Sequence, residues 1–316
     1  MCQRNLLLAL IVVILAGLTV SAQISNSAAQ AYNNATRKIE SGDWDGAIED
    51  YSRAIVLSSR LTREKRGETL AGNSFSGESD EAANITVIDP LTADAYNNRG
   101  VARYHKSDLE GAIADFTSAL RIRPSLANAF LNRAAAKRGL GDLKGALADL
   151  DQSISMNKRQ YEAFNNRGSL RNELHDTKGA LDDLNKALEL NPKSADSLYL
   201  RGYLFIDLKN YDAALADFEK TVKLKPDMAL AYQARGTAWM FKGYMEKALA
   251  NFDEALSRDP EIAWAYFNRS LARTYLGDEA GAERDFNEAI RIRPDLKNDL
   301  VRRTDLARNL RRIGKR

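Results

Sequence analysis

Small, apolar and aromatic positions recur with one fixed period along residues 93–296. An alanine or serine followed by an aromatic or leucine residue returns every 34 positions, at Ala95, Ala129, Ala163, Ser197, Ala231 and Ala265. A second series keeps the same period, at Ala112, Ala146, Ala180, Ala214, Ala248 and Ala282, each followed four residues later by Phe or Leu. Such a period is typical of a stacked array of identical structural elements.

Each period has the pattern of two α-helices. Its apolar positions lie three and four residues apart, which is helical spacing. A proline near the end of most periods, as at Pro124, stops one helix before the next begins. Gly141-Asp142 and Gly277-Asp278 mark the turn inside the period. The sequence therefore predicts an all-α chain of antiparallel helix pairs that bury their apolar faces by stacking.

The order of an aromatic residue, Gly or Ala, Ala, Phe and Pro at this spacing resembles the tetratricopeptide repeat family. The resemblance implies a right-handed superhelical solenoid with six contiguous repeats over residues 93–296. Gly100 and Ala112 are expected where the two helices of a repeat face each other, with Phe116 filling the space against the neighbouring repeat.

Both ends of the array depart from the period. Residues 28–61 form a degenerate first repeat, and residues 62–92 contain an insertion before the array resumes. Its part from Gly67 to Asp80 is rich in Gly, Ser and acidic residues, which indicates a solvated loop, with a binding lid as the alternative. Residues 297–316 begin another first helix and are expected to cap the last repeat.

Residues 1–22 have the pattern of a secretory signal. Arg4 precedes an uncharged apolar run from Leu6 to Leu18, and small residues lead to Ala22. We expect cleavage near Ala22 and an extracytoplasmic location, secreted or periplasmic. An uncleaved anchor is the alternative.

Charge and chemistry favour a binding protein over an enzyme. The chain has a net charge of +3, whereas residues 297–316 alone carry eight basic residues against two Asp. No zinc spacing and no phosphate loop is present, so no cofactor, metal or catalytic residue is predicted. An Asp and an Arg recur once per repeat, as at Asp115 and Arg99, and we interpret them as structural ion pairs rather than an anion-binding ladder.

The family resemblance also implies a peptide-binding groove lined by the first helix of each repeat. The positions it transfers to this chain are Asp94, Asn97, Asn98, Asn128, Asn132, Glu162, Asn165, Asn166, Asp196, Tyr199, Tyr203, Gln233, Trp264 and Phe267. These positions are acidic and rich in amides in one half and aromatic in the other, which favours a neutral or cationic extended segment.

The predicted function is thus an exported, non-catalytic scaffold that binds other proteins or peptides. A purely architectural solenoid and an enzyme with an unrecognised carboxylate site are the alternatives. No nucleic-acid partner is expected, although the basic C-terminus could make a weak contact with an anionic surface.

Overall fold

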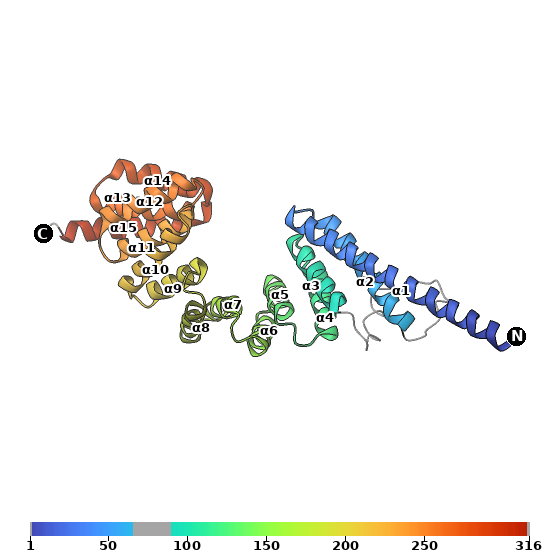
Figure 1. The fold of residues 1–316 in the computed structure, drawn as a ribbon. Helices are drawn as coiled ribbons and strands as arrows, with labels where there is room; N and C mark the ends of the chain where they lie inside the picture. Colours follow the sequence, from blue (N-terminus) through green and yellow to red (C-terminus); the bar gives the residue numbers. More distant parts are fainter. Residues whose placement is uncertain (1, 66–89, 315–316) are drawn as a thin grey trace. The chain divides into compact units, whose positions relative to one another are not determined.

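The structure, a computed structural model, describes residues 2–65 and 90–314, and this part of the chain contains helices and no strand (Figure 1). It divides into an N-terminal unit, residues 1–159, and a C-terminal unit, residues 160–316. The helices of the N-terminal unit are α1 (Cys2–Glu40), α2 (Trp44–Lys65), α3 (Pro90–His105), α4 (Leu109–Ile122), α5 (Ala127–Gly139) and α6 (Leu143–Met156).

The C-terminal unit continues the same alternation. Its helices are α7 (Tyr161–Glu173), α8 (Thr177–Leu190), α9 (Ala195–Asp207), α10 (Tyr211–Leu224), α11 (Ala229–Phe241), α12 (Met245–Arg258), α13 (Ala263–Leu276), α14 (Glu279–Ile292), the short 3₁₀ helix η1 (Pro294–Leu296) and α15 (Lys297–Gly314). Odd-numbered helices are the first helices of the repeats and even-numbered helices are the second helices. The predicted all-α solenoid of antiparallel helix pairs is confirmed.

Tight turns and side-chain caps define each helix pair. Gly141 and Gly277 adopt φ angles of 82° and 95°, a left-handed conformation that glycine reaches without steric penalty. Asp108 caps α4, because its carboxylate accepts a hydrogen bond from the backbone N–H of Gly111 at 3.0 Å. The equivalent Asp residues cap α6, α8 and α14 in the same way.

Close packing inside a repeat depends on small residues. Ala112 is fully buried, and the ring of Phe116, 1% exposed, lies against Gly100. Phe116 also joins a cluster with Ala136 of the following repeat. One aromatic side chain therefore holds the two helices of its own repeat and the next first helix together.

First helices of successive repeats contact one another within each unit. These contacts join α1 to α3 and α3 to α5 in the N-terminal unit, and α7 to α9, α9 to α11 and α11 to α13 in the C-terminal unit. Each unit consequently presents one face built from first helices.

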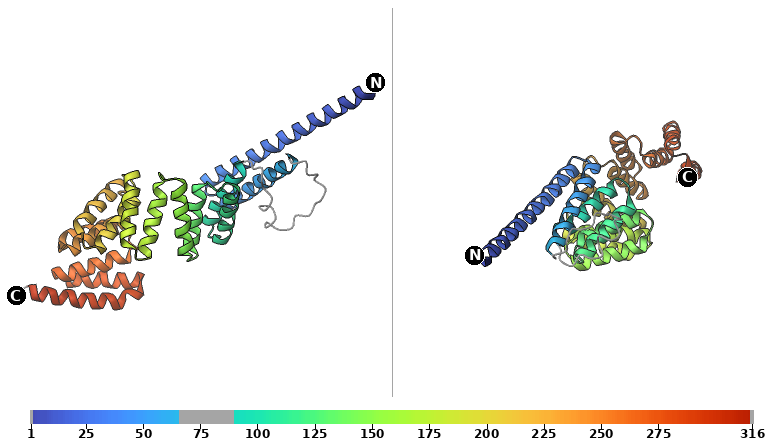
Figure 2. Two further views of the ribbon diagram at one scale, coloured as in Figure 1. Left: turned by 90° about the horizontal axis from the view of Figure 1, so that it is seen from below. Right: turned by 90° about the vertical axis from the view of Figure 1, so that its right-hand side faces the viewer.

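The N-terminal repeat is the pair α1 and α2, which lie side by side in both views of Figure 2. Ala35, Ala47 and Tyr51 are buried between them, as the degenerate repeat requires. Helix α1 runs without a break from Cys2 to Glu40, through the predicted cleavage position. Among the described residues, no helix is long and apolar enough to cross a membrane.

The predicted insertion, residues 62–92, is helical at both ends. Helix α2 continues to Lys65, and α3 begins at Pro90, a favourable first helical residue because its missing N–H has no partner there in any case. The proposed loop from Gly67 to Asp80 lies outside the described residues.

At the other end, α15 packs against α13 in the way that a further first helix would. Leu300 is fully buried there with Leu296 and Phe267. Leu310, further along the predicted cap, is 50% exposed and does not cover the last repeat in the same way. Arg308 and Arg311, in the later turns of α15, instead pair with Glu279 at the start of α14, at 3.0 and 3.2 Å.

Candidate functional site

In each unit, the position near the start of each first helix lies at least partly at the surface. We call these positions the start column: Asp94 and Asn128 in the N-terminal unit, and Glu162, Asp196, Leu230 and Trp264 in the C-terminal unit. Leu230 and Trp264 are 45% and 41% exposed, and Asn128, Glu162 and Asp196 are exposed as well. This start column changes from polar to apolar along the chain.

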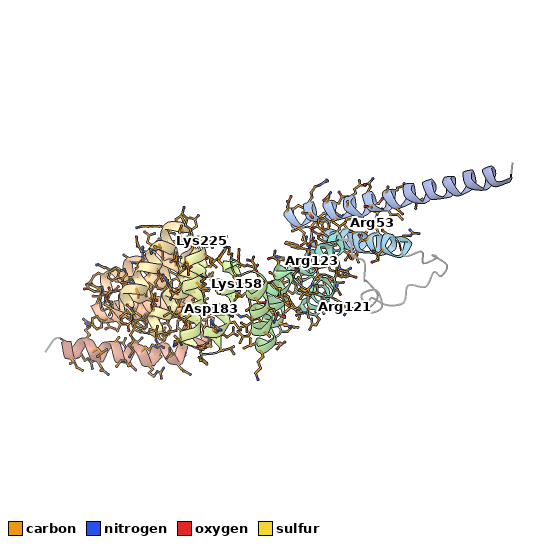
Figure 3. The ribbon with its side chains drawn as sticks, turned by 60° about the horizontal axis from the view of Figure 1, so that its bottom comes forward. Arg53, Arg121, Arg123, Lys158, Asp183 and Lys225 are labelled. Atoms are coloured by element: carbon orange, nitrogen blue, oxygen red, sulfur yellow. The ribbon has the colours of Figure 1, made fainter. Side chains whose placement is uncertain are left out.

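Two acidic residues of the start column form ion pairs inside their own repeats. Asp94 binds Arg123, and Asp196 binds Lys225 at 2.8 Å; Arg123 and Lys225 are labelled in Figure 3. In both pairs the basic residue follows the second helix of the same repeat. The negative charge available to a cationic partner is therefore smaller than the sequence alone indicates.

The amides of the N-terminal unit bond to one another across first helices. Asn132 donates to Asn97 at 3.1 Å, Asn97 donates to Asn98 at 3.0 Å, and Asn98 donates to the hydroxyl of Tyr32 at 2.9 Å. Asn97 is only 9% exposed. These side chains satisfy each other, which holds α1, α3 and α5 together and leaves fewer groups for a ligand.

A second set of bonds joins first helices in the C-terminal unit. Ser197 donates to Asn165 at 2.8 Å, and the hydroxyl of Tyr203 donates to Gln233 at 3.1 Å. Gln233, 7% exposed, donates in turn to Thr237. The neighbouring Asn166 is half-buried. Only part of the predicted groove is thus open to a partner.

The aromatic positions differ in their surroundings. Tyr199 and Tyr203 meet edge to face, with ring centroids 5.0 Å apart, and burial raises the pKa of the Tyr203 hydroxyl above its ordinary value. The prediction that Phe267 forms part of an exposed aromatic surface is wrong. Its side chain is fully buried in a cluster with Leu296 and Leu300, because α15 covers it.

The recurring Arg and Asp form a structural ladder, as predicted. Arg167 binds Asp183 through two hydrogen bonds of 2.9 and 2.7 Å, and Asp183, labelled in Figure 3, is almost fully buried. The same fork-shaped pair joins Arg99 to Asp115, Arg133 to Asp149, Arg201 to Asp217 and Arg269 to Asp285. A buried pair of this kind fixes the first helix against the second helix of its repeat.

Most of these guanidinium groups also reach the second helix of the preceding repeat. Arg133 donates to Thr117 at 3.1 Å, Arg201 to Asn185 at 2.8 Å, and Arg269 to Asp253 at 2.6 Å. A ladder residue therefore links three helices from two repeats.

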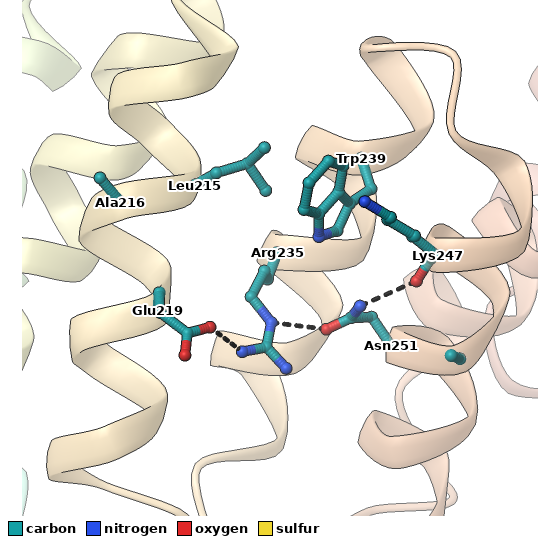
Figure 4. A pocket seen from close by; sticks show the side chains of 8 residues that line it. Leu215, Ala216, Glu219, Arg235, Trp239, Lys247 and Asn251 are labelled. Carbon is teal, nitrogen blue, oxygen red and sulfur yellow. Dashed lines mark hydrogen bonds and ion pairs between the residues drawn. The ribbon is translucent and has the colours of Figure 1, made fainter.

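One repeat lacks the Arg–Asp pair, and the pocket beside its arginine was not predicted from the sequence. In the α11/α12 repeat Asn251 stands where the other five repeats have Asp, so Arg235 donates from Nε to an amide oxygen at 2.6 Å. A pocket of about 470 Å³ opens beside it, lined by α10, α11 and α12 (Figure 4). The replacement of Asp by Asn at this repeated position is the sequence signal that could have revealed it.

Nothing in the described residues suggests a metal centre, since no group of three or more His, Cys, Asp or Glu side chains there could hold an ion. His105 is the last residue of α3 and its ring stacks on Trp44 at 4.3 Å, whereas His175 lies in the turn between α7 and α8.

The repeats of this chain match models of a known protein family. Models of the tetratricopeptide repeat match residues 78–127, 131–195, 195–228, 229–262 and 265–296. No curated protein matches the chain. Among solved structures, a tetratricopeptide repeat protein from Parabacteroides merdae is 22% identical with a TM-score of 0.60, over 88% of this chain and 99% of that chain.

Two further solved structures are similar. The pilF protein of Pseudomonas aeruginosa is 20% identical with a TM-score of 0.59, over 64% of this chain and 92% of its own. The MamA protein is 27% identical with a TM-score of 0.47, over 54% of this chain and 93% of its own. Together with the family models, which cover most of residues 78–296, the repeated helix pairs give one conclusion: the chain belongs to the tetratricopeptide repeat family.

Proposed function

We propose that this protein is an exported, non-catalytic scaffold that binds extended segments of other proteins along the first-helix face of its C-terminal unit. The family as a whole supports a role in protein–protein interaction. The observation that carries the finer proposal is the exposure of Leu230 and Trp264 at equivalent positions of α11 and α13, two first helices that contact each other. Exposed apolar side chains repeated along one face mark an interaction surface.

The surroundings of these two residues favour a particular kind of segment. Asp196 and Glu162 continue the start column with exposed carboxylates, although Asp196 is engaged by Lys225. Trp264 offers an aromatic face that an Arg or Lys side chain can cover. We therefore infer a preference for neutral or cationic segments over acidic ones.

The absence of catalysis is part of the proposal. The carboxylates that repeat along the chain, such as Asp183, are buried in ion pairs with arginine, which suits them for holding helices together. An enzyme with a carboxylate pair would instead need two acidic groups facing a common cavity.

The groove proposal is tested by replacing Trp264 with alanine and measuring affinity for segments captured by cross-linking from native partners. An aromatic anchor in an interface is worth about 1–3 kcal/mol, so affinity should fall roughly fivefold to 150-fold. Tyr275→Ala is the matched control, because Tyr275 is 40% exposed on the same helix but lies outside the start column. Equal losses in both variants, or a loss in neither, would contradict the proposal.

Export is tested separately by N-terminal sequencing of the mature protein. A chain that begins at Gln23 supports removal of residues 1–22. A chain that retains Met1 or Cys2 in a membrane fraction would favour the uncleaved anchor.

A further inference from the structure

Three repeats build a compact ion cluster at the junction of their two helices. In the α7/α8 repeat, Arg171 lies between the buried Asp183, at 2.8 Å, and the cap residue Asp176, at 3.8 Å. Gly179, the third residue of the second helix, lies beside this cluster and donates its backbone N–H to Asp176 at 2.9 Å. The α3/α4 and α13/α14 repeats have the same arrangement, with Arg103 and Arg273 as the bridging residues.

The α11/α12 repeat replaces all four of these positions together. Trp239 stands in place of the bridging arginine, Tyr244 in place of the cap aspartate, Lys247 in place of the glycine, and Asn251 in place of the buried aspartate. The α9/α10 repeat changes three of them but keeps Asp217, and with it the ion pair to Arg201. Only the α11/α12 repeat has lost its own ladder carboxylate.

The replacement of Asp by Asn251 leaves one N–H group of Arg235 without an acceptor among the described residues. Arg235 binds Asn251 through Nε and Glu219 through Nη1, whereas its Nη2 has no bonding partner among the described residues. In the other repeats this nitrogen donates to the second oxygen of the aspartate, as Arg201 does at 2.8 Å. The amide nitrogen of Asn251 cannot accept such a bond, and it donates to the backbone of Lys247 instead.

The pocket next to this donor combines positive charge with an apolar wall (Figure 4). The ammonium group of Lys247 lies 4.3 Å from the centroid of the Trp239 ring, and Leu215 lines the side formed by α10. Arg235 and Lys247 contribute two positive charges, and Glu219 contributes one negative charge. The lining therefore carries a net charge of +1, whereas the fork pair at the same place in the other repeats is neutral.

We propose that this pocket binds the carboxylate of an acidic side chain, Asp or Glu, from a partner protein. The carboxylate supplies the negative charge and the second acceptor that Asn251 lacks: one oxygen accepts from Nη2 of Arg235, and the ammonium group of Lys247 balances its charge. The methylene groups of a glutamate pack against Trp239 and Leu215. A single negative charge matches the net +1 of the lining, while a doubly charged phosphate would meet Glu219 with its second charge.

This site is independent of the first-helix face proposed above, since none of the start-column residues lines it. Its chemistry is also opposite, because it selects an acidic group where the start column favours a neutral or cationic one. Each proposal can therefore fail without the other.

The three tryptophans of the chain allow a direct test with the full-length protein. The probe is the blocked peptide acetyl-Gly-Glu-Gly-amide, titrated in the millimolar range, with acetyl-Gly-Gln-Gly-amide as its uncharged match. The indole N–H signals of Trp239, Trp264 and Trp44 are followed by NMR. We expect the glutamate peptide to shift the Trp239 signal and to bind at least about tenfold more tightly than the glutamine peptide.

The decisive variant is Asn251→Asp, which restores the carboxylate found in the other repeats. It should lower the affinity of the glutamate peptide at least about fivefold, because the new aspartate occupies Nη2 of Arg235. It adds no atoms to the core, and its melting temperature shows whether it folds. Lys247→Ala, which removes an exposed residue, should weaken binding in the same direction.

The matched control is Asp217→Asn, which removes the ladder carboxylate of a repeat that has Ala213 where the site has Lys247. This variant should leave the Trp239 shift unchanged. Equal binding of both peptides, undiminished binding to the Asn251→Asp variant, or a shift confined to Trp264 would each overturn the proposal.

Discussion

The contact between Gly202 and Phe218 gives the sharpest test of how a repeat holds its two helices together. A methyl group added at Gly202 would lie 2.6 Å from Cε1 of Phe218, closer than carbon atoms can approach. The ring is fully buried and is flanked edge to face by Tyr199 and Tyr203 at 6.1 and 5.6 Å. It therefore cannot move aside without disturbing two further aromatic side chains.

Two effects of opposite sign decide the outcome of Gly202→Ala. Alanine favours a helix over glycine by about 1 kcal/mol, while overpacking a core typically costs about 1–3 kcal/mol. Because the phenylalanine is held on two sides, we expect the upper part of that range and a net loss of about 1–2 kcal/mol.

The chain itself supplies the control. At the same place in two other repeats, Ala134 stands with Leu150 and Gly168 with Leu184. A methyl group at Gly168 would lie 3.0 Å from Cγ of Leu184 and 3.2 Å from the backbone oxygen of Ala180, contacts that are tighter than usual but that a shift of a few tenths of an ångström relieves. We expect the stability of Gly168→Ala to change by less than about 0.5 kcal/mol, since the helix preference offsets the contact.

The double variant Gly202→Ala/Phe218→Leu should recover part of the loss, with a coupling free energy of about 1–2 kcal/mol. Repeat arrays do not always unfold in one step, so hydrogen exchange resolved to α9 and α10 is the measurement, beside denaturant unfolding. Equal protection of these helices in Gly202→Ala and the wild type, or no recovery in the double variant, would refute the packing argument.

Three further predictions concern the ladder, the tyrosines and the cap. Asp183→Ala should lower the free energy of unfolding by about 3 kcal/mol, because it leaves the partly buried guanidinium of Arg167 without its carboxylate. Thermal unfolding measures the loss, and a similar loss in Asp182→Ala, which changes an exposed neighbour, would contradict the prediction. Since burial raises the pKa of Tyr203, the folded state should lose stability as the pH rises above about 10, and Tyr203→Phe should reduce that loss in melting curves at pH 8 and 11. Deleting residues 297–316 should expose Phe267 and lower both solubility and the protection of α13, whereas unchanged exchange in α13 would show that α15 is dispensable.

The periodic part of the fold follows directly from the sequence. Arg and Asp are 16 residues apart in five of the six repeats of residues 93–296, which places them on facing helices, and all five pairs form. The helix turns at Gly141 and Gly277 were equally predictable, because a left-handed residue is needed where one helix ends.

The sequence pattern does not determine which neighbour each side chain contacts in the folded chain. A family position indicates the direction in which Phe267 points from its helix, but not that α15 covers it. Asn97 and Asn132 likewise occupy groove positions, yet they form a hydrogen bond with each other. A side-chain amide can hydrogen-bond to a residue of the neighbouring repeat as readily as to a ligand. The pocket at Arg235 depends on departures from the repeat, whereas the prediction followed what the repeats share.

The triple contacts of the ladder arginines have a consequence for the chain under tension. Arg269 binds Asp285 of its own repeat and Asp253 of the preceding repeat through charged hydrogen bonds. Pulling the α13/α14 repeat away from its neighbour therefore loads the hydrogen bonds of one guanidinium group to both repeats. Each repeat released from such an array adds about 110–120 Å of contour length for 34 residues. The α11/α12 repeat should yield at a lower force than its neighbours in single-molecule stretching, since the amide of Asn251 replaces a carboxylate at its rung. The same replacement of Asp by Asn251 would then both weaken this repeat under force and create its binding pocket.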